Sequence, residues 1–212
     1  MSATLTLHDL TVSRGPRVLL DAADLTVAPG DRVGIVGPNG VGKSTLLLAA
    51  SGRLPVDRGE VRLTPPTATV GFLDQEPARS GETVVDLLRR RTGVADADAE
   101  LAAASQSMAL GEPDSAERYD TALQRWLALG SADLDARIGE VAAELGMPSR
   151  VLNQPTYRLS GGEAARAMLA VLLLSRFDTY LLDEPTNDLD LDGLERLERW
   201  VAGLDAGVLL VS

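Results

Sequence analysis

Cysteine is absent from this chain of 212 residues, which excludes disulfide bonds and thiolate metal sites. Long apolar runs are absent as well. The longest, Ala167–Leu174, is much shorter than the twenty or so residues that span a bilayer. The sequence therefore predicts no transmembrane segment in this chain, and its composition fits a cytoplasmic protein.

Basic charge is scarce: 20 basic residues stand against 31 acidic ones, and the formal net charge is −11. This balance argues against a protein that wraps nucleic acid by bulk electrostatics. Arg89-Arg90-Arg91 is the one basic cluster. We interpret it as the solvated end of a helix, where cations suit the helix dipole, in preference to a nucleic-acid patch.

Lysine occurs once, as Lys43, within the pattern G-x-x-x-x-G-K-[ST] of a phosphate-binding loop. Glycines let successive N–H groups turn toward one anion, and a following helix adds the positive end of its dipole. The compact ammonium of Lys43 suits the β- and γ-phosphates, and the Ser44 hydroxyl suits magnesium. A glycine turn that caps a helix is the simpler alternative. The residues assigned to nucleotide binding here are Gly37, Asn39, Gly40, Val41, Gly42, Lys43, Ser44 and Thr45.

The order of the expected elements indicates an α/β fold. Strands are expected at 4–7, 18–20, 25–27, 31–36, 59–63 and 69–73, with a helix after the phosphate loop. Helices are expected at 83–91, 96–110, 114–129, 132–145, 162–175 and 192–204, with strands at 180–182 and 208–211. The pattern favours a mainly parallel core sheet flanked by helices, with a helical insertion.

Two carboxylates follow the apolar strand Thr179–Leu182. At the carboxyl edge of a parallel sheet, Asp183 can bind magnesium and Glu184 can polarise an attacking water. An acidic cap on the next helix is the alternative. Ser160-Gly161-Gly162 before a strong helix predicts a second anion site, although the same residues also make an ordinary helix cap.

Four motifs follow one another along the chain: the phosphate loop, the segment around Gln75, Leu159–Glu163 and Leu181–Asp190. In this order they resemble the motifs of an ATP-binding cassette (ABC) ATPase, and the resemblance covers essentially the whole chain. It implies a P-loop fold with an N-terminal antiparallel β subdomain and a helical subdomain, and ATP and Mg²⁺ as cofactors. Gln75 is then the Q-loop residue near magnesium and the attacking water. Lys43 and Glu184 join Gln75 as catalytic residues, and Ser44, Gln75 and Asp183 form the metal site. Ser160, Gly161 and Gly162 are implied to close over ATP held by a partner cassette, and residues 187–190 form the D-loop.

Within the superfamily, the sequence is most similar to the first cassette of ABC-F proteins, soluble twin-cassette ATPases that act on ribosomes. Glu163 after the signature glycines and the run Glu184–Asp190 carry this similarity. The spacing from Gln75 to Ser160 leaves room for a helical arm, which we assign to 94–130 of a domain spanning 1–212. We expect the chain to be the first half of a longer protein, cut before the switch histidine.

The cassette family usually stacks an aromatic residue on adenine where this chain has Arg14. A guanidinium can stack on a base, so Arg14 and Val18 are assigned to the adenine side of the site. The expected arm is acidic, which disfavours contact with RNA phosphates. Its charges are Asp96, Asp98, Glu100, Glu112, Asp114, Glu117 and Asp120 against Arg118 and Arg125.

The expected partners are a second cassette, in the same full-length chain or as a homodimer copy, and the ribosome. Two alternatives remain open. One is the cytosolic ATPase subunit of an ABC membrane transporter, and the other is an ATP-dependent interaction module that does not hydrolyse ATP.

Overall fold

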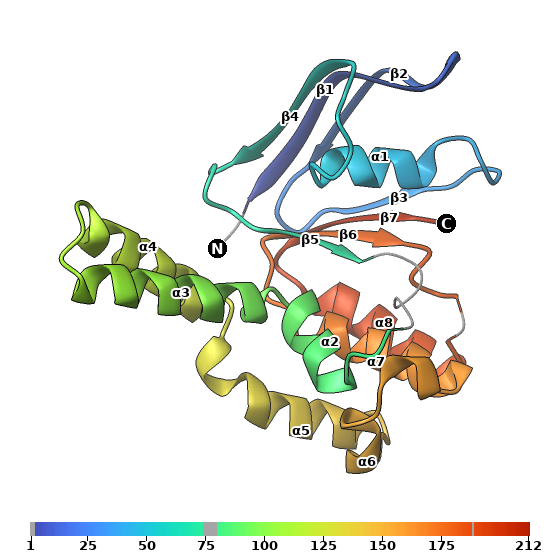
Figure 1. Ribbon diagram of the computed structural model, residues 1–212. Helices are drawn as coiled ribbons and strands as arrows, with labels where there is room; N and C mark the ends of the chain where they lie inside the picture. The colour runs from blue at the N-terminus through green and yellow to red at the C-terminus, as the bar shows by residue number, and fades with distance from the viewer. Residues whose placement is uncertain (1–2, 74–79, 188) are drawn as a thin grey trace. The chain divides into compact units, whose positions relative to one another are not determined.

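A computed structural model describes residues 3–73, 80–187 and 189–212, and the chain divides into two compact units (Figure 1). The first unit contains Met1–Glu76, Phe177–Asn187 and Leu194–Ser212. The second contains Pro77–Arg176 and Asp188–Gly193.

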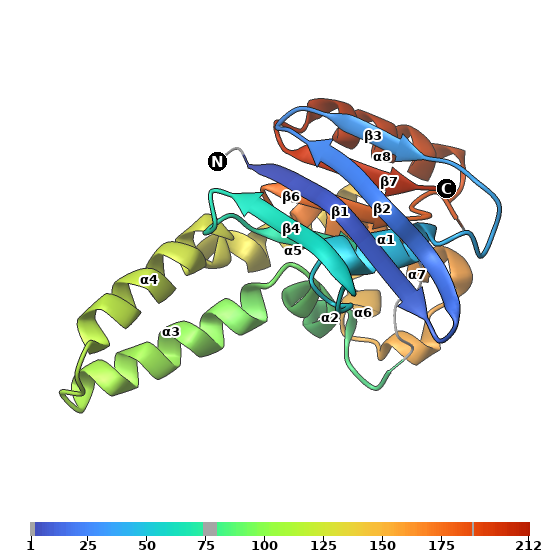
Figure 2. The ribbon, with the colours of Figure 1, turned by 90° about the horizontal axis from the view of Figure 1, so that it is seen from above.

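An antiparallel sheet of three strands forms one layer of the first unit. Its strands are β1 (Thr4–Arg14), β2 (Arg17–Val27) and β4 (Arg58–Thr64), in the order β2-β1-β4 (Figure 2). The sequence interpretation of 18–20 and 25–27 as two strands was wrong, because both belong to β2. The pairing of β1 with β2 contains register shifts, and Asp9 of β1 and Ala22 of β2 have positive φ. These irregularities let the two strands stay paired through 21–24, the polar segment between the two predicted strands.

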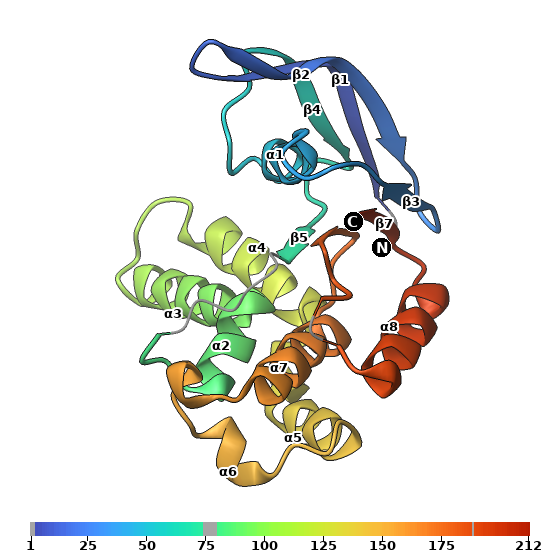
Figure 3. The ribbon, with the colours of Figure 1, turned by 90° about the vertical axis from the view of Figure 1, so that its right-hand side faces the viewer.

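A parallel sheet of four strands forms the other layer, which confirms the predicted parallel core. It contains β3 (Arg32–Ile35), β7 (Gly207–Val211), β6 (Thr179–Asp183) and β5 (Val70–Leu73), in the order β3-β7-β6-β5. All its described pairings are parallel, so the strands end at one edge. Helix α1 (Lys43–Ala50) lies between the two sheets, and its fully buried Leu47 belongs to their shared apolar core (Figures 1 and 3).

The C-terminal part of α8 (Leu191–Gly203) is fixed to the parallel sheet by aromatic and polar contacts. The rings of Trp200 and Tyr180 meet edge to face at 5.0 Å. Burial raises the pKa of Tyr180 to about 12, so its hydroxyl stays neutral and accepts a hydrogen bond from the Phe177 N–H. The Arg32 guanidinium donates to the carbonyl oxygens of Val201, Leu204 and Ala206, the last two following the helix.

The second unit is helical. It contains α2 (Val84–Arg91), α3 (Val94–Ala109), α4 (Ser115–Ala128), α5 (Leu134–Glu144), α6 (Ser149–Leu152) and α7 (Gly161–Leu174), with 3₁₀ turns at Ser131–Asp133 and Thr156–Arg158. Helix α7 packs against α2 and α5 (Figure 3). Helices α3 and α4 pack side by side as the hairpin that the sequence predicts, and ion pairs join Arg125 to Glu100 and Arg118 to Glu112.

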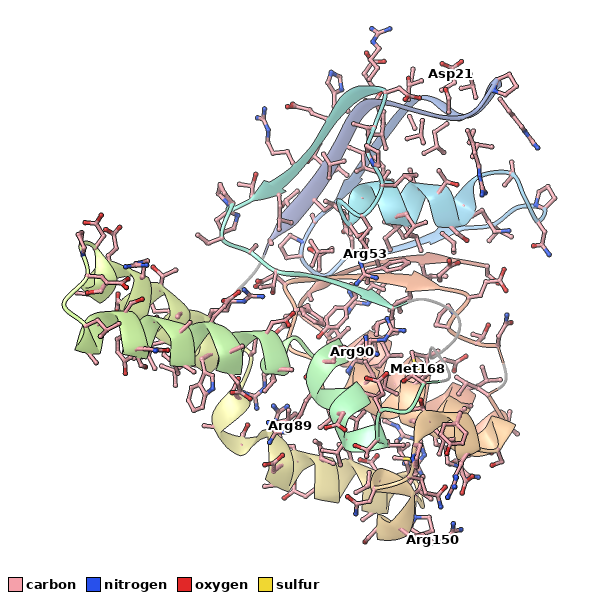
Figure 4. The ribbon with its side chains drawn as sticks, viewed as in Figure 1. Asp21, Arg53, Arg89, Arg90, Arg150 and Met168 are labelled. Carbon is pink, nitrogen blue, oxygen red and sulfur yellow. The ribbon has the colours of Figure 1, made fainter. Side chains whose placement is uncertain are left out.

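The arginine cluster ends helix α2, as its sequence interpretation predicts. Arg89 forms ion pairs with Asp98 and Asp135, and Arg90 pairs with Glu82 (Figure 4). These contacts give the cluster a structural role within the second unit. None of the helices in the described ranges combines the length and apolar character needed to cross a bilayer.

Replacing Gly71 with alanine is expected to destabilise the first unit by about 1–3 kcal/mol, the usual cost of overpacking a core. A Cβ at Gly71 would lie 2.1 Å from Cδ2 of Phe177, whose ring packs on Tyr180. The midpoint of urea unfolding measures the effect. Gly139→Ala is the matched control, because a Cβ there meets nothing within 4 Å and helix α5 favours alanine. An unchanged midpoint for Gly71→Ala would contradict the packing described.

Candidate nucleotide-binding site

The phosphate loop connects the end of β3 to the start of α1, and its backbone geometry explains why glycine occupies two of its positions. Gly40 and Gly42 have φ of 80° and 114°, a region that other residues rarely adopt. A Cβ on Gly42 would also lie 2.9 Å from the carbonyl oxygen of Leu19 in β2. Gly42 is the N-cap of α1, so the first N–H groups of that helix, which have no acceptor within the helix, face the loop. This arrangement suits an anion.

Lys43 is the first residue of α1 and only 8% exposed. Its Nζ donates to the carbonyl oxygens of Gly37 and Pro38, the latter at 3.3 Å, so the loop curls around its ammonium group. A charge this buried requires partners. The partners of the Lys43 ammonium are backbone carbonyls of the same loop. These contacts hold the ammonium inside the loop, where phosphate-binding loops bind their phosphates.

Two of the three predicted magnesium residues are in contact. Ser44 Oγ donates to Asp183 Oδ1 at 3.1 Å, although the residues lie 139 positions apart. Asp183 ends strand β6 and is 9% exposed. A hydroxyl and a carboxylate are hard oxygen ligands, and Mg²⁺ in nucleotide sites commonly takes one or two protein ligands together with phosphates and water. The donor set therefore fits this ion. Gln75, the third residue, lies outside the described residues.

Glu184 follows β6 directly and has a φ of 46°, an uncommon conformation for a residue with a side chain. Its N–H donates to the carbonyl oxygen of Val211 at 2.9 Å, and Asn187 Nδ2 donates to its Oε2 at 2.6 Å. The Asn187 N–H also donates to the Glu184 carbonyl oxygen at 3.2 Å. The backbone bonds fix the turn, and the bond from Asn187 Nδ2 orients the carboxylate. The sequence interpretation missed this role of Asn187, for which the three-residue spacing in a turn is the available signal.

Arg14 and Val18 lie at the end of the β1–β2 hairpin, where Arg14 pairs with Arg17. Both are exposed, and Val18 is 54% exposed despite its apolar side chain. The neighbouring Leu19 contributes the carbonyl that touches the Gly42 position, so this end of β2 lies beside the phosphate loop. Their assignment to adenine stays a prediction.

Ser160, Gly161 and Gly162 belong to the second unit and are exposed at the start of α7. Ser160 is the N-cap of that helix, and its side chain forms a capping box with Glu163. Ser160 therefore caps the helix, as the alternative interpretation of the sequence predicts. A cap does not exclude an anion site, because the first N–H groups of the helix remain without intrahelical acceptors. The signature role stays a prediction.

Comparison with known proteins agrees with these features. The family model described as ABC transporter matches residues 20–187. The tylosin resistance ATP-binding protein TlrC of Streptomyces fradiae is 34% identical over 100% of this chain and 40% of its own length. The energy-dependent translational throttle protein EttA of Mycobacterium tuberculosis is 35% identical over 98% of this chain and 37% of its own length. The chain thus spans about two-fifths of the length of these ABC-F relatives.

Solved structures share the fold. The ATP-binding subunit of an ABC transporter superposes with a TM-score of 0.67 at 21% identity, over 98% of this chain and 78% of that one. A bacterial Atm1-family ABC exporter with ATP bound has a TM-score of 0.67 at 19% identity, over 100% of this chain and 35% of that one. With these likenesses, the family match and the residues of the phosphate loop, the chain belongs to the ABC transporter family as an ATP-binding cassette, and it is most like the first cassette of ABC-F proteins.

Proposed function

We propose that this chain binds ATP with magnesium, hydrolyses it, and serves as one cassette of an ABC-F type protein that acts on the ribosome. The observation that carries the chemistry is the contact between Ser44 and Asp183 beside the buried ammonium of Lys43. The observation that favours ABC-F over other cassettes is the similarity to TlrC and EttA, whose names describe tylosin resistance and a translational throttle.

In the proposed site, the loop N–H groups and Lys43 bind the β- and γ-phosphates. Lys43 Nζ exchanges the carbonyl oxygens of Gly37 and Pro38 for phosphate oxygens. Ser44 and Asp183 would hold a magnesium ion, which would supply positive charge for phosphoryl transfer. The contact between Ser44 and Asp183 thereby links the phosphate loop to the end of β6.

Glu184 is the proposed base that orients and polarises the attacking water. A carboxylate can accept a proton or a hydrogen bond from water only when its lone pairs face it, so its orientation matters. Asn187 supports that orientation by donating to Oε2 of the carboxylate. Gln75 is proposed to contact both the magnesium ion and this water.

ATP is proposed to lie between the phosphate loop of one cassette and the signature of another, so this chain supplies half of each of two sites. We therefore expect slow hydrolysis by the isolated chain. The partner cassette is a second one in the native-length protein or another copy of this chain. The α3–α4 hairpin, within the assigned 94–130, is the proposed ABC-F arm.

The test uses the native-length protein with Glu184→Gln, and with the corresponding glutamate of any second cassette also replaced. With hydrolysis blocked, ATP is expected to carry the protein into the ribosomal pellet, whereas ADP is not, because binding of the closed state is then not followed by release. The matched control is Glu198→Gln, a carboxamide substitution of a glutamate in α8.

The remaining outcomes separate the alternatives. Protein that stays in the supernatant, or that sediments with membranes, would contradict ribosome action and favour the transporter motor. Equal pelleting with ATP by the wild-type protein and by Glu184→Gln, with no phosphate released by either, would favour the module that does not hydrolyse ATP.

A further inference from the structure

The Ser160 hydroxyl donates its proton to the Glu163 carboxylate. Ser160 Oγ donates to Glu163 Oε2 at 2.8 Å, and the Ser160 N–H donates to the same oxygen at 3.0 Å. The Glu163 N–H donates back to Ser160 Oγ at 3.3 Å. A serine hydroxyl has one proton to donate. In this arrangement that proton is committed to Glu163.

The proposed function, on which this inference rests, requires the opposite orientation. To bind the terminal phosphate of ATP on a partner cassette, Ser160 Oγ must donate its proton to a phosphate oxygen. The Glu163 carboxylate competes for this proton, and its charge also repels the incoming phosphate. The N–H and Oγ of Ser160 are thus already bonded to the Glu163 carboxylate, at the place where a phosphate of ATP would bind.

Glu163 has a second partner, Arg150, within the same unit. Arg150 of α6, labelled in Figure 4, places Nη2 3.8 Å from Glu163 Oε1, and the Arg150 side chain is 67% exposed. The Glu163 carboxylate therefore contacts Ser160 through Oε2 and Arg150 through Oε1 at the same time, and a shift between these two partners needs only a small movement of the side chain. Bonds from the backbone and side chain of Ser160, with the charges of Arg150 and Arg166, lower the pKa of Glu163, which keeps it ionised at neutral pH.

We propose that Glu163 is a positioning residue that withholds the Ser160 hydroxyl from phosphate until cassette closure moves its carboxylate to Arg150. Glu163 then makes the closed state easier to reopen. A glutamine at this position can still accept the Ser160 N–H through its amide oxygen, but it carries no charge and competes less for the hydroxyl proton.

The test measures the lifetime of the closed state in the native-length protein, with hydrolysis blocked by Glu184→Gln and by the same replacement in any second cassette, because Ser160 is proposed to contact the nucleotide of the partner cassette. The protein is loaded with a fluorescent ATP analogue and chased with excess ATP. Adding Glu163→Gln is expected to slow release of the analogue by about tenfold, as for one hydrogen bond to a charged group gained. Arg150→Ala is expected to accelerate release, because Glu163 then stays on Ser160. Glu140→Gln, an exposed glutamate of α5, is the matched control.

The thermal midpoint separates this role from helix capping: loss of the charged cap in Glu163→Gln is expected to lower the midpoint slightly relative to Glu140→Gln, whereas a purely structural role would not slow release of the analogue. Release that is unchanged or faster in Glu163→Gln would overturn the proposal. Ser160→Ala distinguishes this failure from failure of the proposed function. If Ser160→Ala shortens retention while Glu163→Gln does not lengthen it, only the inference fails. If Ser160→Ala has no effect on retention, the signature role fails and the inference with it.

Discussion

Hydrolysis is expected to fall by about 10²- to 10⁴-fold when Glu184 becomes glutamine, the usual contribution of a general base, while the affinity for ATP stays unchanged. The glutamine amide oxygen can keep the bond from Asn187, and the backbone bond to Val211 does not involve the side chain. The change therefore removes the basicity and preserves the geometry. The positive φ of Glu184 supports a functional reason for the residue, since strained residues of this kind cluster at active sites.

The measurement is phosphate release by the native-length protein, with the corresponding glutamate of any second cassette also replaced. Glu60→Gln, in the exposed ion pair with Arg62 on β4, is the control for loss of a carboxylate in the same unit. Wild-type rates in Glu184→Gln would show that another group polarises the water. A parallel loss of ATP affinity would instead point to a structural role.

Affinity for ATP is expected to fall by about 10²- to 10³-fold when Lys43 becomes alanine, because two hydrogen bonds from a charged group are lost. Lys43→Arg is not expected to restore it. The loop curls around a compact ammonium at Gly37 and Pro38, and a planar guanidinium needs more room.

Equilibrium titration with a fluorescent ATP analogue measures this effect. Arg62→Ala on β4 matches the loss of one positive charge at an exposed position of the same unit. If Arg62→Ala weakens binding as much as Lys43→Ala does, the attraction comes from overall charge. That result would contradict a specific contact in the phosphate loop.

Short-range rules account for what could be predicted. The phosphate loop needs positive φ and a close approach at Gly42, and only glycine allows both, so the motif is visible in the sequence. The α3–α4 hairpin was also predictable, because Gly111 at φ 69° ends a strongly helical segment. The parallel core follows from alternation of strands and helices.

Long-range pairing accounts for what was missed. Strand β2 runs through a polar segment only because β1 pairs with it across irregular register, and the sequence of β2 alone does not contain that information. The contact of Ser44 with Asp183 could be inferred from the order of motifs, but the support of Glu184 by Asn187 depends on the turn after β6. The sequence indicates Glu163 only as a feature of the ABC-F resemblance, whereas its hydrogen bonds with Ser160 depend on side-chain geometry.

We expect the phosphate loop of this chain to bind ATP together with magnesium. Calorimetric titration of the chain with ATP, in Mg²⁺ and in EDTA, measures this binding. The expected result is one nucleotide bound per chain, more tightly with Mg²⁺, because Ser44 and Asp183 complete the metal site. Absence of binding, or binding that is equal in EDTA and unaffected by Lys43→Ala, would contradict the account.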